Sequence, residues 1–164
     1  MLLAVVLIAL GETSGALLSE LRPSVQRYAR GRVAANAATH GLAGSAEYDT
    51  EVTSRAVFAS EAGLSFFHTH AEGLGLLVLF VSTVGATAVP WRLTRAAIYL
   101  LVSIGGLFPL GYLVFGMAVL ERGLDDGIAL AERWVLTPLG STALAGVGLL
   151  AVAVAVRLMR GRAS

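Results

Sequence analysis

Two histidines and a glutamate stand at the start of a long apolar run in the stretch SFFHTHAEGLG, residues 65–75. An α-helix turns by about 100° per residue, so His68 and Glu72, four residues apart, share one face. His70 projects to the opposite side, and a regular helix therefore cannot bring both imidazoles to one ion. Imidazole and carboxylate ligands together suit iron, zinc or manganese, and a single imidazole can be an axial haem ligand.

Other polar residues are predicted to approach this pair from neighbouring helices. A carboxyl group deep in a membrane is costly, so Glu12 should be protonated, paired or bound to a metal. We expect Glu12 to lie within hydrogen-bond reach of Tyr112, His68 or Glu72. Glu20 and Thr137 are expected near the same end of the bundle. His40 falls in a polar segment, where we expect a solvated surface histidine.

The composition indicates a membrane protein of one domain, residues 1–164. Hydrophobic residues make up 56% of the chain and charged residues only 14%, whereas a soluble domain has about a quarter charged residues. The net charge of +1 gives no basic excess, so no nucleic-acid partner is expected. Cysteine is absent, which excludes disulfides, thiolate metal sites and cysteine-attached haem.

Four stretches are apolar and long enough to cross a bilayer, which takes about 20 residues. The first could instead be a signal peptide, but it lacks a basic beginning and a small-x-small cleavage site, so we predict that it is retained. The segment 22–65 is expected outside the membrane, with a short helix near 30–44 and the second helix beginning near Thr50. The predicted spans are 2–21, 66–89, 96–120 and 135–156.

Arginine in short loops sets the expected orientation. Arginines occur in the turn after the second span and behind the fourth, at Arg92, Arg95, Arg157, Arg160 and Arg162. Both chain ends are therefore predicted on the cytoplasmic side, with 22–65 and the acidic stretch ERGLDDGIALAER as outer loops. Five arginines within 22–65 argue against this orientation. All 12 basic residues are arginine, which is typical of a GC-rich genome and favours a prokaryotic inner membrane.

Small and polar residues recur on one face of each span, which predicts close packing in an all-α, up-down four-helix bundle. Pro109 should kink the third span and free a carbonyl near Gly105. The predicted inward faces are Glu12, Gly15, Ala16 and Ser19 in the first span, Gly105, Pro109, Tyr112 and Gly116 in the third, and Thr137, Ser141, Gly148 and Ala155 in the fourth.

The run FFHTHAEGLGLLVLFVSTVGATAVPW, followed by GGLFPLGYLVFG, resembles small membrane proteins related to the catalytic subunit of haem–copper oxidases and nitric oxide reductases. The resemblance covers roughly the second and third spans. It implies that His68 or His70 is an axial haem ligand. The oxidases take the opposite ligand and their copper histidines from later helices, whereas the third and fourth spans here contain no histidine. A catalytic oxygen or nitric oxide site is therefore not expected.

Three functional hypotheses remain open. The first is a redox-associated subunit that binds haem b through candidates His68, His70 and Tyr112, or a divalent ion through His68, Glu72 and Glu12. A second axial ligand could come from His40, a partner subunit or a homo-oligomer. The alternatives are a non-catalytic accessory subunit of a larger membrane complex and a proton or small-solute carrier. No nucleophile–base pair or phosphate loop occurs, so the isolated chain is not expected to be an enzyme.

Overall fold

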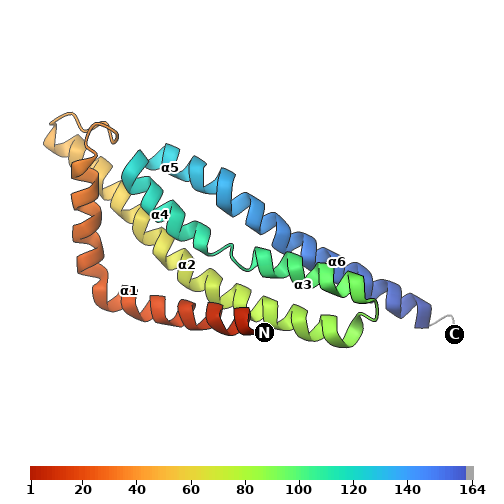
Figure 1. Ribbon diagram of the computed structural model, residues 1–164. Helices are drawn as coiled ribbons and strands as arrows, with labels where there is room; N and C mark the ends of the chain where they lie inside the picture. The colour runs from red at the N-terminus through yellow and green to blue at the C-terminus, as the bar shows by residue number, and fades with distance from the viewer. Residues whose placement is uncertain (162–164) are drawn as a thin grey trace.

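The computed structural model describes residues 1–161, and residues 162–164, including Arg162, lie outside the described part. Between residues 1 and 161 the chain is all helical and has no strand, which confirms the predicted fold class. The elements run up and down as one elongated bundle (Figure 1). They are α1 (Leu2–Ala35), α2 (Ala46–Ala88), α3 (Arg92–Gly105), α4 (Leu110–Arg122), α5 (Leu124–Ala131), the π-helix η1 (Glu132–Leu136) and α6 (Thr137–Gly161).

Four helical segments are long and apolar enough to cross a membrane: Leu2–Ala35, Ala46–Ala88, Arg92–Arg122 and Leu124–Gly161. Each overlaps one predicted span and is longer. Because α2 has 43 residues, it is about 65 Å long, about twice the thickness of the hydrocarbon layer of a bilayer. The bundle therefore continues beyond the apolar layer. We call the end with loop 36–45 the head, and the end with turn 89–91 the base.

α1 is one helix where the sequence predicts a span and a separate outer segment. It continues through Pro23 to Ala35, and α2 already begins at Ala46, so only residues 36–45 form a loop. The predicted short helix over 30–44 is instead the end of α1 followed by this loop. Figure 1 shows α1 bent between its apolar part and its head part. Pro23 accounts for the bend, because proline donates no backbone bond and crowds the carbonyl four residues earlier.

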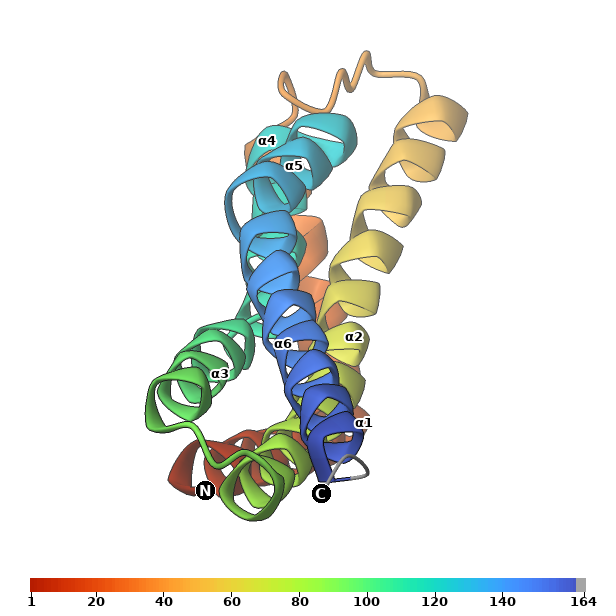
Figure 2. The ribbon, with the colours of Figure 1, turned by 90° about the vertical axis from the view of Figure 1, so that its right-hand side faces the viewer.

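The third membrane segment is broken in the middle, as Pro109 predicts. α3 ends at Gly105 and α4 begins at Leu110, and Figure 2 shows the two helices pointing in different directions. The Gly105 carbonyl is not free, however. It accepts a 2.9 Å bond from the Phe108 amide in a tight turn, so the connection satisfies the carbonyl that proline leaves without its helical partner.

A single glycine forms the turn between the third and fourth segments. Gly123 has φ +86°, and a Cβ there would lie 3.3 Å from the Thr39 carbonyl oxygen, so a side chain would be strained. The helix resumes at Leu124, and the acidic stretch 121–133, predicted as an outer loop, is therefore mostly helical. The π-turn η1 then joins α5 to α6 without a break, just before Pro138.

Glycines let the helix backbones come close together. α1 packs mainly against α2, and α3 mainly against α6. A Cβ on Gly105 would lie 2.5 Å from the backbone of Ala143, and one on Gly63 would lie 2.8 Å from the Tyr112 carbonyl oxygen. Lipid provides no hydrophobic drive for helix association, so such close contact is a main source of packing energy. The small-residue face predicted for the third span is confirmed.

The predicted inward faces of the first and fourth spans are wrong. In α1 the residues Glu12, Ala16 and Ser19 are exposed, and in α6 so are Thr137, Ser141, Gly148 and Ala155. The buried positions are instead Ala4, Leu7 and Gly11 in the apolar part of α1, and Ala143, Gly146, Leu150 and Ala153 in α6. Both helices are apolar almost all round, so their sequence pattern does not mark the packed side.

Two apolar cores lie along the bundle, one toward the base and one in the head. The base core includes Val81, Ile98 and Leu150, and the head core includes Val33, Val57 and Val119. His68 and His70 lie in the part of α2 between these two cores. α2 contacts both α1 and α4.

Candidate functional site

The His68 ring lies flat against α1 and has a defined tautomer. Its Nδ1 is 2.9 Å from the Gly11 carbonyl oxygen, and since a carbonyl only accepts, Nδ1 carries the proton and donates. In the neutral ring Nε2 then keeps its lone pair, and it has no hydrogen-bond partner among residues 1–161. Gly15 makes room for the ring, because a Cβ there would lie 2.6 Å from His68 Cε1.

Glu72 lies beside this imidazole but receives no hydrogen bond at one oxygen. Its Oε1 is 2.8 Å from His68 Nδ1, yet the one N–H of Nδ1 points at Gly11 instead. Oε1 is buried and has no donor among the described residues. The pair thus combines an oriented imidazole with an incompletely satisfied carboxyl oxygen, an arrangement suited to receiving a proton or a cation.

A cleft of about 520 Å³ opens between α1 and α2, with His68 in its wall. Its walls are largely apolar, and its head end carries Arg22, whose Nε is 3.5 Å from Glu61 Oε1. The cleft thus combines a largely apolar wall with one arginine–glutamate pair at its head end. The lining residues are Gly15, Leu18, Ser19, Arg22, Phe58, Glu61, Ala62, Ser65, Phe66 and His68.

His70 belongs to a different environment, as the helical spacing predicts. Its Nδ1 donates to the Phe66 carbonyl oxygen at 2.8 Å, and its Nε2 faces the Tyr112 hydroxyl at 3.4 Å. The His70 ring packs against Phe66, Phe108 and Tyr112, with the Tyr112 centroid 4.7 Å away. The two histidines therefore face α1 and α4 respectively. The candidate cofactor set of His68, His70 and Tyr112 does not come together at one point.

The predicted approach of Glu12 to these groups is wrong. Glu12 is exposed and makes no hydrogen bond or ion pair with any residue between 1 and 161. Glu20 and Thr137 are exposed as well. The described part of the chain holds no group of three His, Cys, Asp or Glu side chains placed for a metal ion. The ligand set of His68, Glu72 and Glu12 is therefore not assembled, because His68 and Glu72 of α2 contact the side of α1 that carries Gly11 and Gly15 and not the side that carries Glu12.

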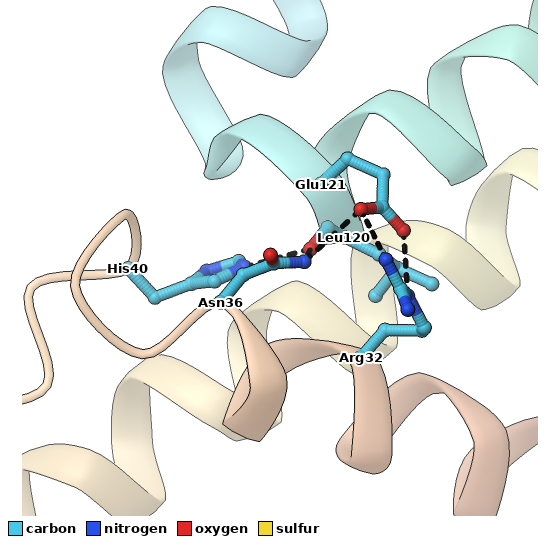
Figure 3. Close-up of polar contacts among 5 residues, drawn as sticks. All are labelled: Arg32, Asn36, His40, Leu120 and Glu121. Atoms are coloured by element: carbon cyan, nitrogen blue, oxygen red, sulfur yellow. Dashed lines mark hydrogen bonds and ion pairs between the residues drawn. The ribbon is translucent and has the colours of Figure 1, made fainter.

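A network of polar side chains that the sequence did not reveal links the end of α1 to the end of α4 in the head (Figure 3). Arg32 binds Glu121 through two bonds, Nε to Oε1 at 2.7 Å and Nη2 to Oε2 at 2.5 Å. Asn36 donates to Glu121 Oε2 and to the Leu120 carbonyl oxygen, both at 3.1 Å. His40 Nε2 donates to the same carbonyl at 3.0 Å. The end of α1 and its loop thus satisfy the Leu120 carbonyl in the last turn of α4 and the Glu121 side chain beside it.

The charges of this network stabilise one another outside the apolar stretches. The hydrogen bond from the Arg32 guanidinium lowers the pKa of Glu121 below its ordinary value, and the Asn36 bond acts in the same direction. The Glu121 carboxylate in turn raises the pKa of Arg32. His40 is only 8% exposed, so the expectation of a solvated histidine is wrong. The spacing of Arg32, Asn36 and His40, four residues each, is the one signal that they share a face.

Comparison with known proteins gives no match: no protein-family model, curated protein or solved structure is similar to this chain. The fold and the site therefore define only its class, a helical membrane protein with four helices that could span a bilayer.

Proposed function

We propose that the chain is a redox-associated membrane subunit that binds haem b through His68 Nε2 in the α1–α2 cleft. The observation that carries the proposal is the bond from His68 Nδ1 to the Gly11 carbonyl, which fixes the ring and leaves Nε2 without a hydrogen bond in a residue that lines a largely apolar cleft. Axial haem histidines require such an oriented ring with an unprotonated nitrogen. The resemblance of the run that begins FFHTHAEGLG implies a ligand at His68 or His70, and it agrees with His68 as one of the two.

The chemistry of the rest of the cleft supports the proposal. Apolar side chains such as Leu18 and Phe58 suit a porphyrin plane, and Arg22 at the head end suits a propionate. Bound haem would supply one-electron transfer. The other described histidines, His40 and His70, lie outside this cleft, so a second protein ligand would come from a partner or a second copy of the chain. The chain then acts as an electron carrier within a complex and not as an enzyme alone.

Haemin titration of the purified protein tests the proposal. The chain should bind haemin with a sharpened Soret band, and His68→Ala should abolish it. His70→Ala is the matched control and should bind as the wild type does, because His70 faces α4. Absence of a Soret band, or equal loss in both variants, would contradict haem binding at His68.

A bare divalent ion is the second candidate for the same place. The donor-free Oε1 of Glu72, 2.8 Å from His68 Nδ1, favours it. An ion between these two atoms would replace the Nδ1 proton and so break the bond to the Gly11 carbonyl. The ion would have two protein ligands and would take the others from water. Metal analysis of the purified chain separates the candidates: one equivalent of metal without a Soret band, lost in Glu72→Gln, indicates an ion.

We further propose that the chain lies in a prokaryotic inner membrane with the base on the cytoplasmic side. Arginines at the base support this orientation, including Arg157, which donates to the Thr87 carbonyl. The natural absence of cysteine makes the test direct. A Ser45→Cys chain should react with an impermeant thiol reagent in whole spheroplasts, and a Leu93→Cys chain should react only after lysis. The reverse pattern would show the opposite orientation.

A further inference from the structure

The apolar part of α1 presents a polar surface away from the rest of the protein. Glu12 is exposed there and has no partner in the described part of the chain. Its neighbours on this surface are small or carry hydroxyls. We call this surface the outer α1 face; it consists of Ala9, Glu12, Thr13 and Ala16, all of them exposed and none of them in the lining of the α1–α2 cleft.

The contacts of the preceding residue place Glu12 within the apolar layer. Gly11 packs against Glu72, since a Cβ on Gly11 would lie 2.8 Å from Glu72 Cγ. Glu72 precedes Thr87 by 15 residues in α2, which is about 22 Å of helix. Arg157 donates to the Thr87 carbonyl at the base. If this contact marks the base-side boundary of a hydrocarbon layer about 30 Å thick, the head-side boundary lies about 8 Å beyond Glu72. Glu12, next to Gly11, then lies at the depth of Glu72, about 8 Å inside that boundary.

A carboxyl group at this depth is costly when it faces lipid, even in its neutral form. Ionisable side chains in membrane helices normally face a partner group, and none of residues 1–161 provides one. A group outside the described part of the chain is therefore the natural partner for this carboxyl. Small residues on both sides of Glu12, Ala9 and Ala16, let another helix come close enough to reach it.

A second copy of the chain has no cation to offer at this depth. Residues 2–21, 63–87, 96–120 and 135–156 contain no arginine or lysine. The imidazoles of His68 and His70 are turned toward the α1–α2 cleft and the α2–α4 seam. A parallel pair of α1 helices would bring two Glu12 carboxyl groups together, and these can pair only if at least one of them is protonated. A cation on a different polypeptide pairs with the ionised carboxylate as well, and charge complementarity therefore favours that partner.

We propose that the outer α1 face binds a transmembrane helix of another polypeptide that carries an arginine or lysine at the depth of Glu12. Arginine fits best, because its guanidinium forms two parallel bonds to a carboxylate. The interaction does not depend on haem, since Glu12 lies outside the cleft residues. Loss of haem binding and loss of this contact can therefore be observed separately.

A designed peptide tests the proposal in neutral phosphatidylcholine vesicles. The probe is a leucine–alanine transmembrane peptide with one arginine about two turns from its head-side end. Association with the chain, labelled at Ser45→Cys, is measured by energy transfer. We expect the arginine peptide to bind about tenfold more tightly than the same peptide with leucine, because one interhelical polar contact has an effect on affinity of about this size.

Substitutions at the carboxylate identify the contact. Glu12→Gln should remove the preference for the arginine peptide, and Glu12→Arg should transfer it to a peptide with glutamate in that place. Glu20→Gln, an exposed glutamate nearer the head, is the matched control and should leave it intact. Equal binding of the arginine and leucine peptides would overturn the proposal. A disulfide-linked homodimer of Ala16→Cys in the same vesicles would overturn it too, because the second copy would be the occupant.

Discussion

Replacing Gly15 by alanine should disturb the His68 ligand more than the fold. The new Cβ would lie 2.6 Å from His68 Cε1 and 2.7 Å from Nδ1, whereas ordinary contacts begin at 3.4 Å. Because closely packed helix backbones cannot easily separate, the ring itself must move away from α1 by about 0.8 Å. The same movement lengthens the 2.9 Å bond from Nδ1 to the Gly11 carbonyl, to about 3.7 Å at most, and tilts it, so that the bond is weakened or lost.

Loss of this orienting bond should weaken haemin binding. Removing a group that orients a ligand histidine typically costs about ten- to a hundredfold in affinity, and we expect that range for Gly15→Ala. The free energy of unfolding should change by less than about 1 kcal/mol, because the higher helix propensity of alanine offsets part of the strain. Titration at the Soret band measures the affinity, and thermal unfolding in detergent measures the stability.

Gly73→Ala is the control, because Gly73 lies near His68 in α2 and nothing lies within 4 Å of a Cβ added there. Wild-type haemin affinity in the Gly15→Ala chain would refute the reasoning, as would an equal loss in Gly73→Ala. The ¹⁵N resonances of the His68 ring give a readout that needs no haem. If the Nδ1 signal of Gly15→Ala matched the wild type, the ring would not have moved.

The helix packing, the head network and the contact between His70 and Tyr112 lead to three further expectations. Gly105→Ala should lower the free energy of unfolding by about 1–3 kcal/mol, because its Cβ would lie 2.5 Å from the α6 backbone. Thermal unfolding should show no such loss for Gly148→Ala, where a Cβ meets open space. Acid should loosen the head: the pKa of Glu121 is lowered by Arg32, so their pairing stabilises the fold above the ordinary glutamate pKa of about 4.3 and is lost as the pH falls through the lowered pKa. Hydrogen exchange at the end of α1 measures this, and a Glu121→Gln chain that loosened equally with acid would contradict it. Tyr112→Phe should leave haemin affinity unchanged and cost less than about 1 kcal/mol, since its hydroxyl contact is long, at 3.4 Å. A large loss of either would show that Tyr112 belongs to the site.

The sequence alone determined the features that depend on local spacing or on single residues. Apolar length predicts the four membrane segments, because a helix needs a minimum run to cross a bilayer. Pro109 predicts the break in the third of them, since proline cannot continue the hydrogen-bond pattern. The 100° turn per residue predicts that His68 and His70 face different neighbours, and they contact α1 and α4.

The head could have been predicted only in part. Residues 22–65 are polar enough to leave the membrane, but their continuity with α1 and α2 depends on packing against α4. Pro23 alone favours a break, whereas the buried Val33 and the bonds of Arg32 to Glu121 hold the helix beyond it. Tertiary contacts of this kind link residues 89 positions apart, which no local pattern records.

The packed face of α1 was decided by tertiary structure. Gly11 and Gly15 occupy one side of the helix and Glu12 with Ala16 another, and both sides are small enough to pack against a neighbour. In water, polarity would distinguish the two, but in lipid both sides meet an apolar medium and close contact decides. The ring of His68 fits only where no Cβ stands, above Gly15. Because of this fit, the side of α1 that carries Gly11 and Gly15 packs against α2, and the side that carries Glu12 faces outward.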